Sequence, residues 1–430
     1  MIFVKPISEE PEYSDTINSE SIHSEINTVR VIIMNNALSC FKKSALFISI
    51  LSSIAATNTF AADDTGFIAG SETKVNFRYR FENVDQDGQT NDAQASTLRS
   101  RISFKSGEVS HFRLNAEVDN VTTIGADDYN DASGFRSNTG YPVVADPTGT
   151  SLNQLNLTYK NDGTSVTLGR QRINLNNQRF VGGVAWRQNE QTYDGIRGQH
   201  SFNDALSVDY SYIYYVSRIF GPDGPKRGLD GDFHFINAHY KLNKDHKFTG
   251  FAYLLEDDSW ANSNDTYGID YNGKFGSLKA HASFATQSNG DFDANYFAID
   301  GTMKLAMFNV TVGLEQLGSD NGNYGFSTPL ATAHKFQGFA DKFLGTPKTG
   351  VKDYYSKIAT KIGPVAVAGF YHQFDAVEGD QNYGSEIDLV ATYKVHKTTT
   401  LLAKYADYNA DDLATDTQKF WLMANVNFSL

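Results

Sequence analysis

The chain has 430 residues, one cysteine and a net charge of −13, with 40% hydrophobic and 13% aromatic residues. A mean hydropathy of −0.40 excludes a bundle of membrane-spanning helices, each of which would need about 20 consecutive apolar residues. The single cysteine excludes a disulfide scaffold and cysteine-ligated metal sites, and the acidic balance argues against non-specific nucleic-acid binding.

The first 61 residues differ from the rest of the chain. Residues 34–61 combine Lys42 and Lys43 with a short apolar run and end at Ala61, which is the arrangement of a secretory signal peptide. Residues 1–33 are polar and contain several glutamates, so we expect them to be an upstream extension from a misassigned start. Residues 62–430 are expected to form the folded protein.

Apolar and polar residues then alternate with a period of two, which indicates β-strands with two different faces. In residues 72–84, Phe77 and Tyr79 share one face and Arg78 and Arg80 share the other. The sequence contains eighteen predicted strands, at 72–84, 97–105, 112–121, 153–160, 164–173, 192–200, 205–217, 233–241, 247–255, 267–273, 278–287, 296–303, 308–317, 351–361, 365–374, 383–394, 399–408 and 418–430.

The connections between these strands are alternately long and short. The long ones are 85–96, 122–152, 174–191, 218–232, 256–266, 288–295, 318–350, 375–382 and 409–417. Outer-membrane barrels have this pattern, with short periplasmic turns and long extracellular loops, whereas a soluble secreted lectin has no reason for it. We therefore predict an all-β fold, a transmembrane antiparallel β-barrel of about 18 strands in the outer membrane of a Gram-negative cell.

Charged residues occupy the predicted inner face of this barrel. Charges do not stay unpaired in a dry core, so the inner face predicts a water-filled lumen of porin size. The expected partners are outer-membrane lipid and lipopolysaccharide, the barrel-assembly machinery, which would recognise the last strand ending at Leu430, and anionic saccharides or small anions. No nucleic-acid partner, cofactor or metal is expected.

Arginine is confined to one half of the chain. All arginines except Arg30 lie between Arg78 and Arg227. Five fall on the predicted lumen face of the first three strands (Arg78, Arg80, Arg99, Arg101 and Arg113), and five surround the connection 174–191 (Arg170, Arg172, Arg179, Arg187 and Arg197). Guanidinium groups stay charged and bind carboxylates, so they predict either an anion-selective wall or a wall neutralised by pairing with Glu82, Glu117 and Asp119.

Two segments resemble the alginate-export family of outer-membrane porins. Residues 169–195 read GRQRINLNNQRFVGGVAWRQNEQTYDG and residues 326–347 read FSTPLATAHKFQGFADKFLGTP. The resemblance implies an eighteen-stranded barrel with an Arg-lined constriction that passes a polyuronate. Matched positions in the second segment add His334, Lys335, Asp341 and Lys342 to the pore-lining residues. Unlike the dedicated exporter, this chain has short predicted periplasmic turns throughout, which favours a smaller pore for acidic or neutral saccharides.

Both segments carry apolar residues that would be poorly solvated outside the barrel, so we expect them to fold into the lumen and narrow it (Phe180, Val181, Val184, Phe336, Phe339 and Phe343). The predicted function is a porin for passive diffusion or export of anionic saccharides, and no enzyme. A general porin for small hydrophilic solutes is the alternative. A barrel hydrolase is a minor alternative, because His334 stands beside Lys335 but no nucleophile motif is present.

Overall fold

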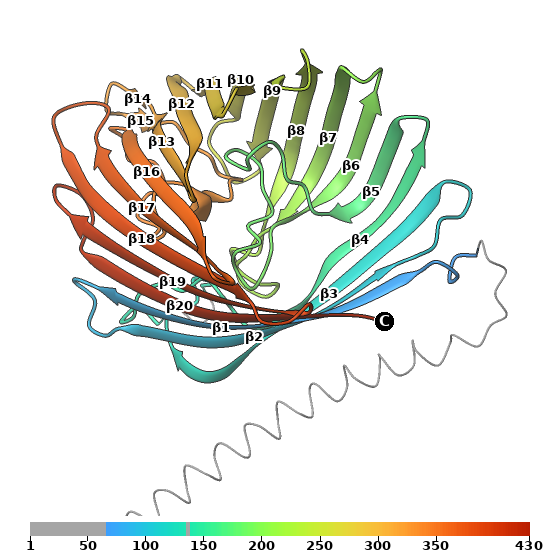
Figure 1. Cartoon of the computed structure of the whole chain (residues 1–430), viewed down its shortest axis with the longest axis horizontal. Helices are drawn as coiled ribbons and strands as arrows, with labels where there is room; N and C mark the ends of the chain where they lie inside the picture. Colours follow the sequence, from blue (N-terminus) through green and yellow to red (C-terminus); the bar gives the residue numbers. More distant parts are fainter. Residues whose placement is uncertain (1–65, 135–137) are drawn as a thin grey trace, which may run out of the picture. The chain divides into compact units, whose positions relative to one another are not determined.

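The computed structural model describes residues 66–134 and 138–430, which lie within one compact unit, Ala62–Leu430. They form one 18-stranded antiparallel sheet (Figure 1). Strand β1 (Glu72–Gln86) pairs with both β2 (Ala93–Lys105) and β20 (Thr417–Ser429), so the sheet closes into a barrel. The predicted fold class is confirmed, while the predictions for residues 1–33 and 34–61 lie outside the described residues.

Each barrel strand pairs with the strand on either side of it, and β1, β2 and β20 are three of these strands. The others are β3 (Phe112–Asp128), β4 (Gly149–Asn161), β5 (Thr164–Gln171), β6 (Thr192–Ser201), β7 (Leu206–Ser217), β8 (Gly228–Lys241), β9 (His246–Asp257), β10 (Asn264–Phe275), β11 (Leu278–Asn289), β12 (Phe292–Leu305), β13 (Phe308–Leu317), β16 (Val351–Ile362), β17 (Val365–Asp375), β18 (Asn382–Lys394) and β19 (Thr399–Ala410). A small ribbon, β14 (Ser319–Asp320) with β15 (Tyr324–Gly325), and the 3-10 turn η1 (Ala333–Lys335) lie between β13 and β16. No helix within residues 66–134 and 138–430 has the length and apolar composition needed to cross a membrane.

The two faces of the strands differ as the alternation predicts. Arg78 of β1 lies opposite Arg99 of β2, and both are buried on the inner face. On the outer face, large aliphatic side chains expose more than half of their surface, as Leu168, Val312 and Ile358 do. Such exposure is unfavourable in water and normal in lipid, so the outer face is a membrane-facing apolar belt.

One predicted connection is wrong. Residues 288–295 were expected to form a long loop, but β11 and β12 extend into this segment and leave only the turn Gly290–Asp291. Gly290 adopts a φ of +61°, which a tight turn requires and which glycine adopts without steric cost.

Two long connections between strands shape the interior of the barrel. They are residues 172–191, called here loop A, and residues 318–350, called here loop B.

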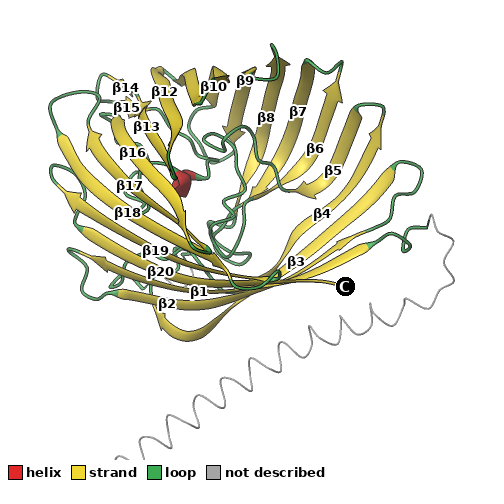
Figure 2. Cartoon of the chain, in the orientation of Figure 1, coloured by secondary structure: helices red, strands yellow, loops and turns green. Residues whose placement is uncertain are grey.

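Loops A and B run inside the ring of strands, where Figure 2 also shows η1. Phe180 of loop A packs against Phe251 and Tyr296 of the barrel wall, with ring centroids 5.0 and 5.2 Å apart. Phe343 of loop B packs against Phe374 at 4.5 Å. The apolar core of the protein therefore lies within the barrel, between the two loops and the inner wall, and the predicted inward folding of both segments is confirmed.

Carboxylates of β18 hold the backbone of loop B. Glu386 accepts a hydrogen bond from the amide of Ala340 at 2.7 Å, and Asp388 accepts one from the amide of Phe339 at 3.2 Å. Gly338 has a φ of +79°, and a Cβ there would lie 2.2 Å from the Glu386 carboxylate. This approach between loop and wall therefore requires glycine at position 338.

Candidate functional site

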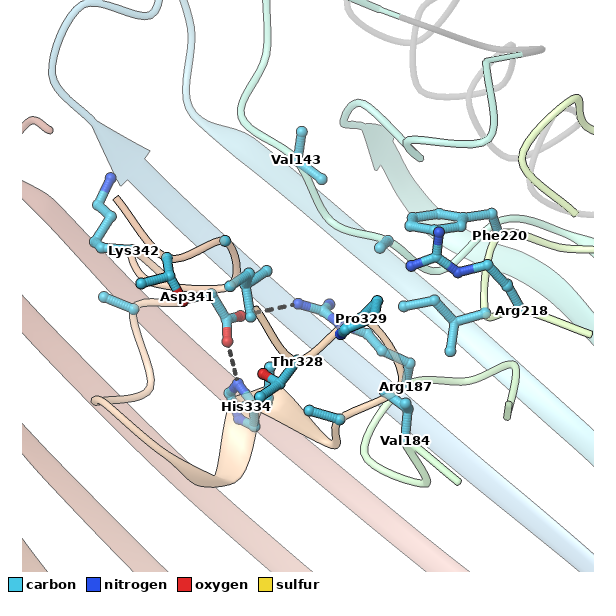
Figure 3. A pocket seen from close by; sticks show the side chains of 18 of the residues that line it. Val143, Val184, Arg187, Arg218, Phe220, Thr328, Pro329, His334, Asp341 and Lys342 are labelled. Atoms are coloured by element: carbon cyan, nitrogen blue, oxygen red, sulfur yellow. Dashed lines mark hydrogen bonds and ion pairs between the residues drawn. The ribbon is translucent and has the colours of Figure 1, made fainter. Parts of the chain in front are cut away.

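A cavity of about 840 Å³, called here the vestibule, opens among the long connections. Its lining combines the aromatic rings of Tyr141, Phe220 and Trp260 with several amide and hydroxyl side chains. The charged lining residues are Arg187, Arg218, Asp341, Lys342 and Lys419, most of which Figure 3 shows.

Asp341 of loop B organises the floor of the vestibule. Its Oδ2 lies 3.2 Å from the Arg187 guanidinium and its Oδ1 lies 2.7 Å from Nδ1 of His334 (Figure 3). The same Oδ2 lies 3.2 Å from the Lys419 Nζ. Although burial opposes ionisation, His334, Lys419 and Arg187 together hold the pKa of Asp341 well below its usual value. Asp341 is therefore a charged bridge that joins loops A and B to β20.

His334 is a neutral bridge between loop B and β19. Its Nε2 accepts a hydrogen bond of 2.8 Å from Nζ of Lys404, so its proton lies on Nδ1 and is donated to Asp341. The imidazole stacks on Trp186 of loop A, with ring centroids 4.6 Å apart. Burial and the nearby Lys404 lower the pKa of His334 to about 3 despite Asp341. Both ring nitrogens are thus occupied by structural partners.

A buried ion-pair network connects this floor to β1. Arg187 lies 3.0 Å from Glu82, which also pairs with Arg80 at 2.8 Å. Arg80 lies 3.5 Å from Asp146 in the connection between β3 and β4. Since every member is buried, loss of one partner would leave an uncompensated charge in a poorly solvated place.

A second network ties loop A to β2 and β3. Arg101 binds Asp119 at 2.6 Å and Glu190 of loop A at 2.8 Å. Arg172 lies 2.8 Å from Glu117 and also binds Glu190. Although burial opposes ionisation, Arg101 and Arg172 lower the pKa of Glu190. The two networks pair arginines with Glu82, Glu117 and Asp119, which is one of the two alternatives that the sequence left open.

The remaining predicted site residues do not form a continuous track. Several have their own carboxylate partners, in the pairs Arg170–Asp194, Arg179–Glu315, Arg197–Asp209 and Arg113–Glu108, and Arg99 lies 3.5 Å from Glu190. Arg78 donates to backbone carbonyls of loop A, and Lys335 donates to the carbonyl of Asn177 on the far side of η1 from the vestibule. Of the predicted set, only Arg187, His334, Asp341 and Lys342 line the vestibule.

Among the described cations that line the vestibule, Arg218 and Lys342 stand apart because neither has a carboxylate within 4 Å, whereas Arg187 and Lys419 are paired. The Arg218 guanidinium lies over the Phe220 ring, 5.0 Å from its centroid, on the vestibule wall (Figure 3). Burial and Lys419 lower the pKa of Lys342 to about 8, which leaves it mostly cationic at neutral pH. Arg218 and the wall lysines Lys404 and Lys419 were not among the predicted site residues, because nothing local in the sequence distinguishes them from other cations near strand ends.

We expect acidification to weaken the docking of loop B. Once the loop is released, His334 regains its ordinary pKa of 6.5, so between pH 6.5 and about 3 the released loop binds a proton that the docked loop excludes. The lowered pKa of Asp341 acts in the same direction, because docking is favoured while that carboxylate is charged. Channel-opening events in planar bilayers should become more frequent from pH 7 to pH 4. His334→Gln, which has no titrating group in this range, should flatten the profile, and an unchanged profile would contradict the assignment.

The first half of the barrel resembles a known family of proteins. Residues 70–218 match the alginate-export family model. The matched region contains the first of the two resembling segments, residues 169–195, together with most of the paired arginines and Arg218. It confirms the resemblance seen in the sequence. No curated protein matches the chain.

Several solved structures have the same barrel fold over most of this chain. OccAB4 of Acinetobacter baumannii is 16% identical, with a TM-score of 0.67 over 84% of this chain and 98% of that one. The outer-membrane protein OpdK of Pseudomonas aeruginosa is 14% identical, with a TM-score of 0.67 over 85% of this chain and 100% of that one. OpdK has also been solved with vanillate. At these identities the likeness shows the fold, which this chain shares with an outer-membrane protein, and the predicted outer-membrane location agrees with it.

Proposed function

We propose that this barrel is a channel for anionic saccharides, either alginate-like polyuronates or smaller acidic solutes, which enter through the vestibule by passive diffusion or leave through it by export. The observation that carries the proposal is the pair of unpaired cations, Arg218 and Lys342, on the vestibule wall. The lumen arginines with carboxylate partners have part of their charge cancelled locally, whereas these two groups can bind a passing carboxylate.

The rest of the vestibule suits a sugar ring. Phe220 and Trp260 present aromatic faces, and the amides of Gln191 and Asn264 supply donors and acceptors for hydroxyl groups. Charged residues in a pore lining set its ion preference, so two free cations at the outer entrance favour anions. Vanillate, which is bound in an OpdK structure, is also a carboxylate, and this supports a small acidic solute as substrate.

A general porin for small hydrophilic solutes is the second candidate. It is favoured by the two ion-pair networks, which leave the wall near β1 to β3 with little uncompensated charge. We do not propose an enzyme, because the ring nitrogens of His334 are engaged by Asp341 and Lys404 and neither is free to activate a nucleophile.

The proposed setting is a lipid bilayer with lipopolysaccharide in its outer leaflet. The apolar belt would contact lipid, and acidic residues of the outer connections, such as Asp411 and Asp412, could bind lipopolysaccharide through divalent cations. Delivery would require the secretory signal predicted at residues 34–61, and insertion would require recognition of β20 by the barrel-assembly machinery.

Block of single-channel current distinguishes the two candidates. Uronate oligomers added on the side of the long connections should interrupt the current at concentrations at which neutral oligosaccharides of equal length have no effect. Equal block by charged and neutral oligomers would favour the general porin. Vanillate and inorganic phosphate extend the series and test whether a carboxylate is required.

A further inference from the structure

A second, smaller cavity lies on the other side of η1. Ala333 and His334 line the vestibule, whereas the next residues, Lys335 to Phe339, line a cavity of about 160 Å³, called here the inner cavity. Its opposite side is formed by the inward faces of β11, β12, β13, β16 and β17. Loop B therefore separates two spaces of different chemistry.

Gln337 is an unusual residue on this boundary. Its side chain lines the inner cavity, the residue is only 3% exposed, and its Nε2 has no hydrogen-bond partner among the described residues. Its φ of +55° lies in the left-handed region, where a side chain is strained. A buried amide without a partner is also unfavourable. Two such costs at one residue beside a cavity indicate that the amide serves a ligand.

The wall opposite Gln337 supplies acceptors. Asp300 binds His281 at 2.8 Å, Asp353 binds His372 at 2.9 Å, and Glu315 binds Arg179 at 2.8 Å. A carboxylate has about four lone-pair positions, so each of these groups can accept further hydrogen bonds. Because each carboxylate already has a basic partner, no bound cation is needed to neutralise these groups. Among the described residues no group of three or more His, Cys, Asp or Glu side chains is placed to hold a metal.

Aromatic rings complete the lining. Tyr296, Tyr355, Phe336 and Phe370 surround the same space. Lys335, the one lysine of this lining, already donates to the Asn177 carbonyl, so the cavity offers an anion no free ammonium group. The rings disfavour a small, strongly hydrated ion. A polyol satisfies all these groups, since its hydroxyls donate to carboxylates, its oxygens accept from the amide, and its C–H groups pack on the rings. The volume is several times the ~30 Å³ share of one water molecule, which is enough for a short polyol.

We propose that the inner cavity is a binding site for the hydroxyl-rich, uncharged part of a solute, with Gln337 as its donor and Asp300, Asp353 and Glu315 as its acceptors. The inference rests on the proposed channel function only in that the solute must reach the lumen. It does not depend on the anion preference of the vestibule.

Mannitol is a suitable neutral probe. Calorimetric titration of the purified full chain in detergent should detect mannitol binding, and Gln337→Gly should weaken it about five- to tenfold, the effect of losing one hydrogen bond. The same substitution should raise the melting temperature, because glycine relieves the left-handed strain. This opposite change separates a lost ligand contact from a damaged fold. Gln381→Gly, an exposed amide in the connection between β17 and β18 that lines neither cavity, should leave mannitol affinity unchanged.

Two results would overturn the inner site. One is the absence of mannitol binding to the wild-type chain, which would mean that water alone occupies the cavity. The other is equal binding by wild type and Gln337→Gly. Uronate block at the vestibule should not change in Gln337→Gly. If uronates fail to block while mannitol binds, the anion proposal fails and the inner site stands.

Discussion

Removal of residues 330–344 should raise single-channel conductance several-fold. These residues carry η1, the Asp341 bridge and the rings of Phe339 and Phe343, all of which occupy the barrel interior. An eighteen-stranded barrel is wide enough for an aqueous channel when nothing fills it, so loop B and loop A set the size of the pore. Planar-bilayer recording of the wild type and the deletion variant measures the difference directly.

The control for this deletion is a short deletion in another connection, one that does not fill the lumen. Residues 378–380 are exposed in the connection between β17 and β18, and their removal should leave conductance unchanged. Heat-modifiable migration on gels would show that both variants still close into barrels. Equal conductance in wild type and the 330–344 deletion would mean that loop B does not restrict the pore.

The double substitution Arg218→Gln and Lys342→Gln should abolish most of the anion preference. These two side chains are cations of the vestibule without a carboxylate partner, so their loss removes positive potential without unpairing a buried acid. The reversal potential under a salt gradient should shift toward the non-selective value. A shift of this kind should be largest at low ionic strength, because salt screens exposed charges.

The matched control is Arg113→Gln. Arg113 is also an arginine, but it lies at the rim of the short turns, its side chain is 36% exposed, and Glu108 is 3.5 Å away. Its substitution should change selectivity little. Arg101 is unsuitable as a control, because its removal would leave Asp119 buried without its ion-pair partner at a cost of about 3–5 kcal/mol. An unchanged reversal potential in the double variant would assign selectivity to other groups.

The strands were predictable because a membrane barrel imposes a local rule. Each residue faces either lipid or lumen, so Phe77 and Arg78 reveal their faces by chemistry alone. Closure of the predicted sheet follows because every backbone polar group inside lipid must be paired within the protein. The short turn at Gly290 was not predicted because the sequence around it contains Asp291 and Asp293, which are typical of loops. The ends of β11 and β12 therefore did not look like strands.

The site was only partly predictable because its contacts are long-range. Loop A was recognised as an arginine-rich constriction, but its partners Glu82, Asp146 and Glu315 are far away in sequence. No local pattern shows that Arg101 is paired and Arg218 is not. The distinction depends on which carboxylates the closed barrel brings near each guanidinium, and only the three-dimensional structure supplies that.

The reversal potential of the wild-type chain, measured in a planar bilayer under a tenfold salt gradient, decides whether this barrel is an anion-preferring channel. We predict discrete channel currents with a reversal potential of the sign that anion preference gives. A cation-selective current, or a membrane that stays silent with correctly folded barrels inserted, would rule this function out.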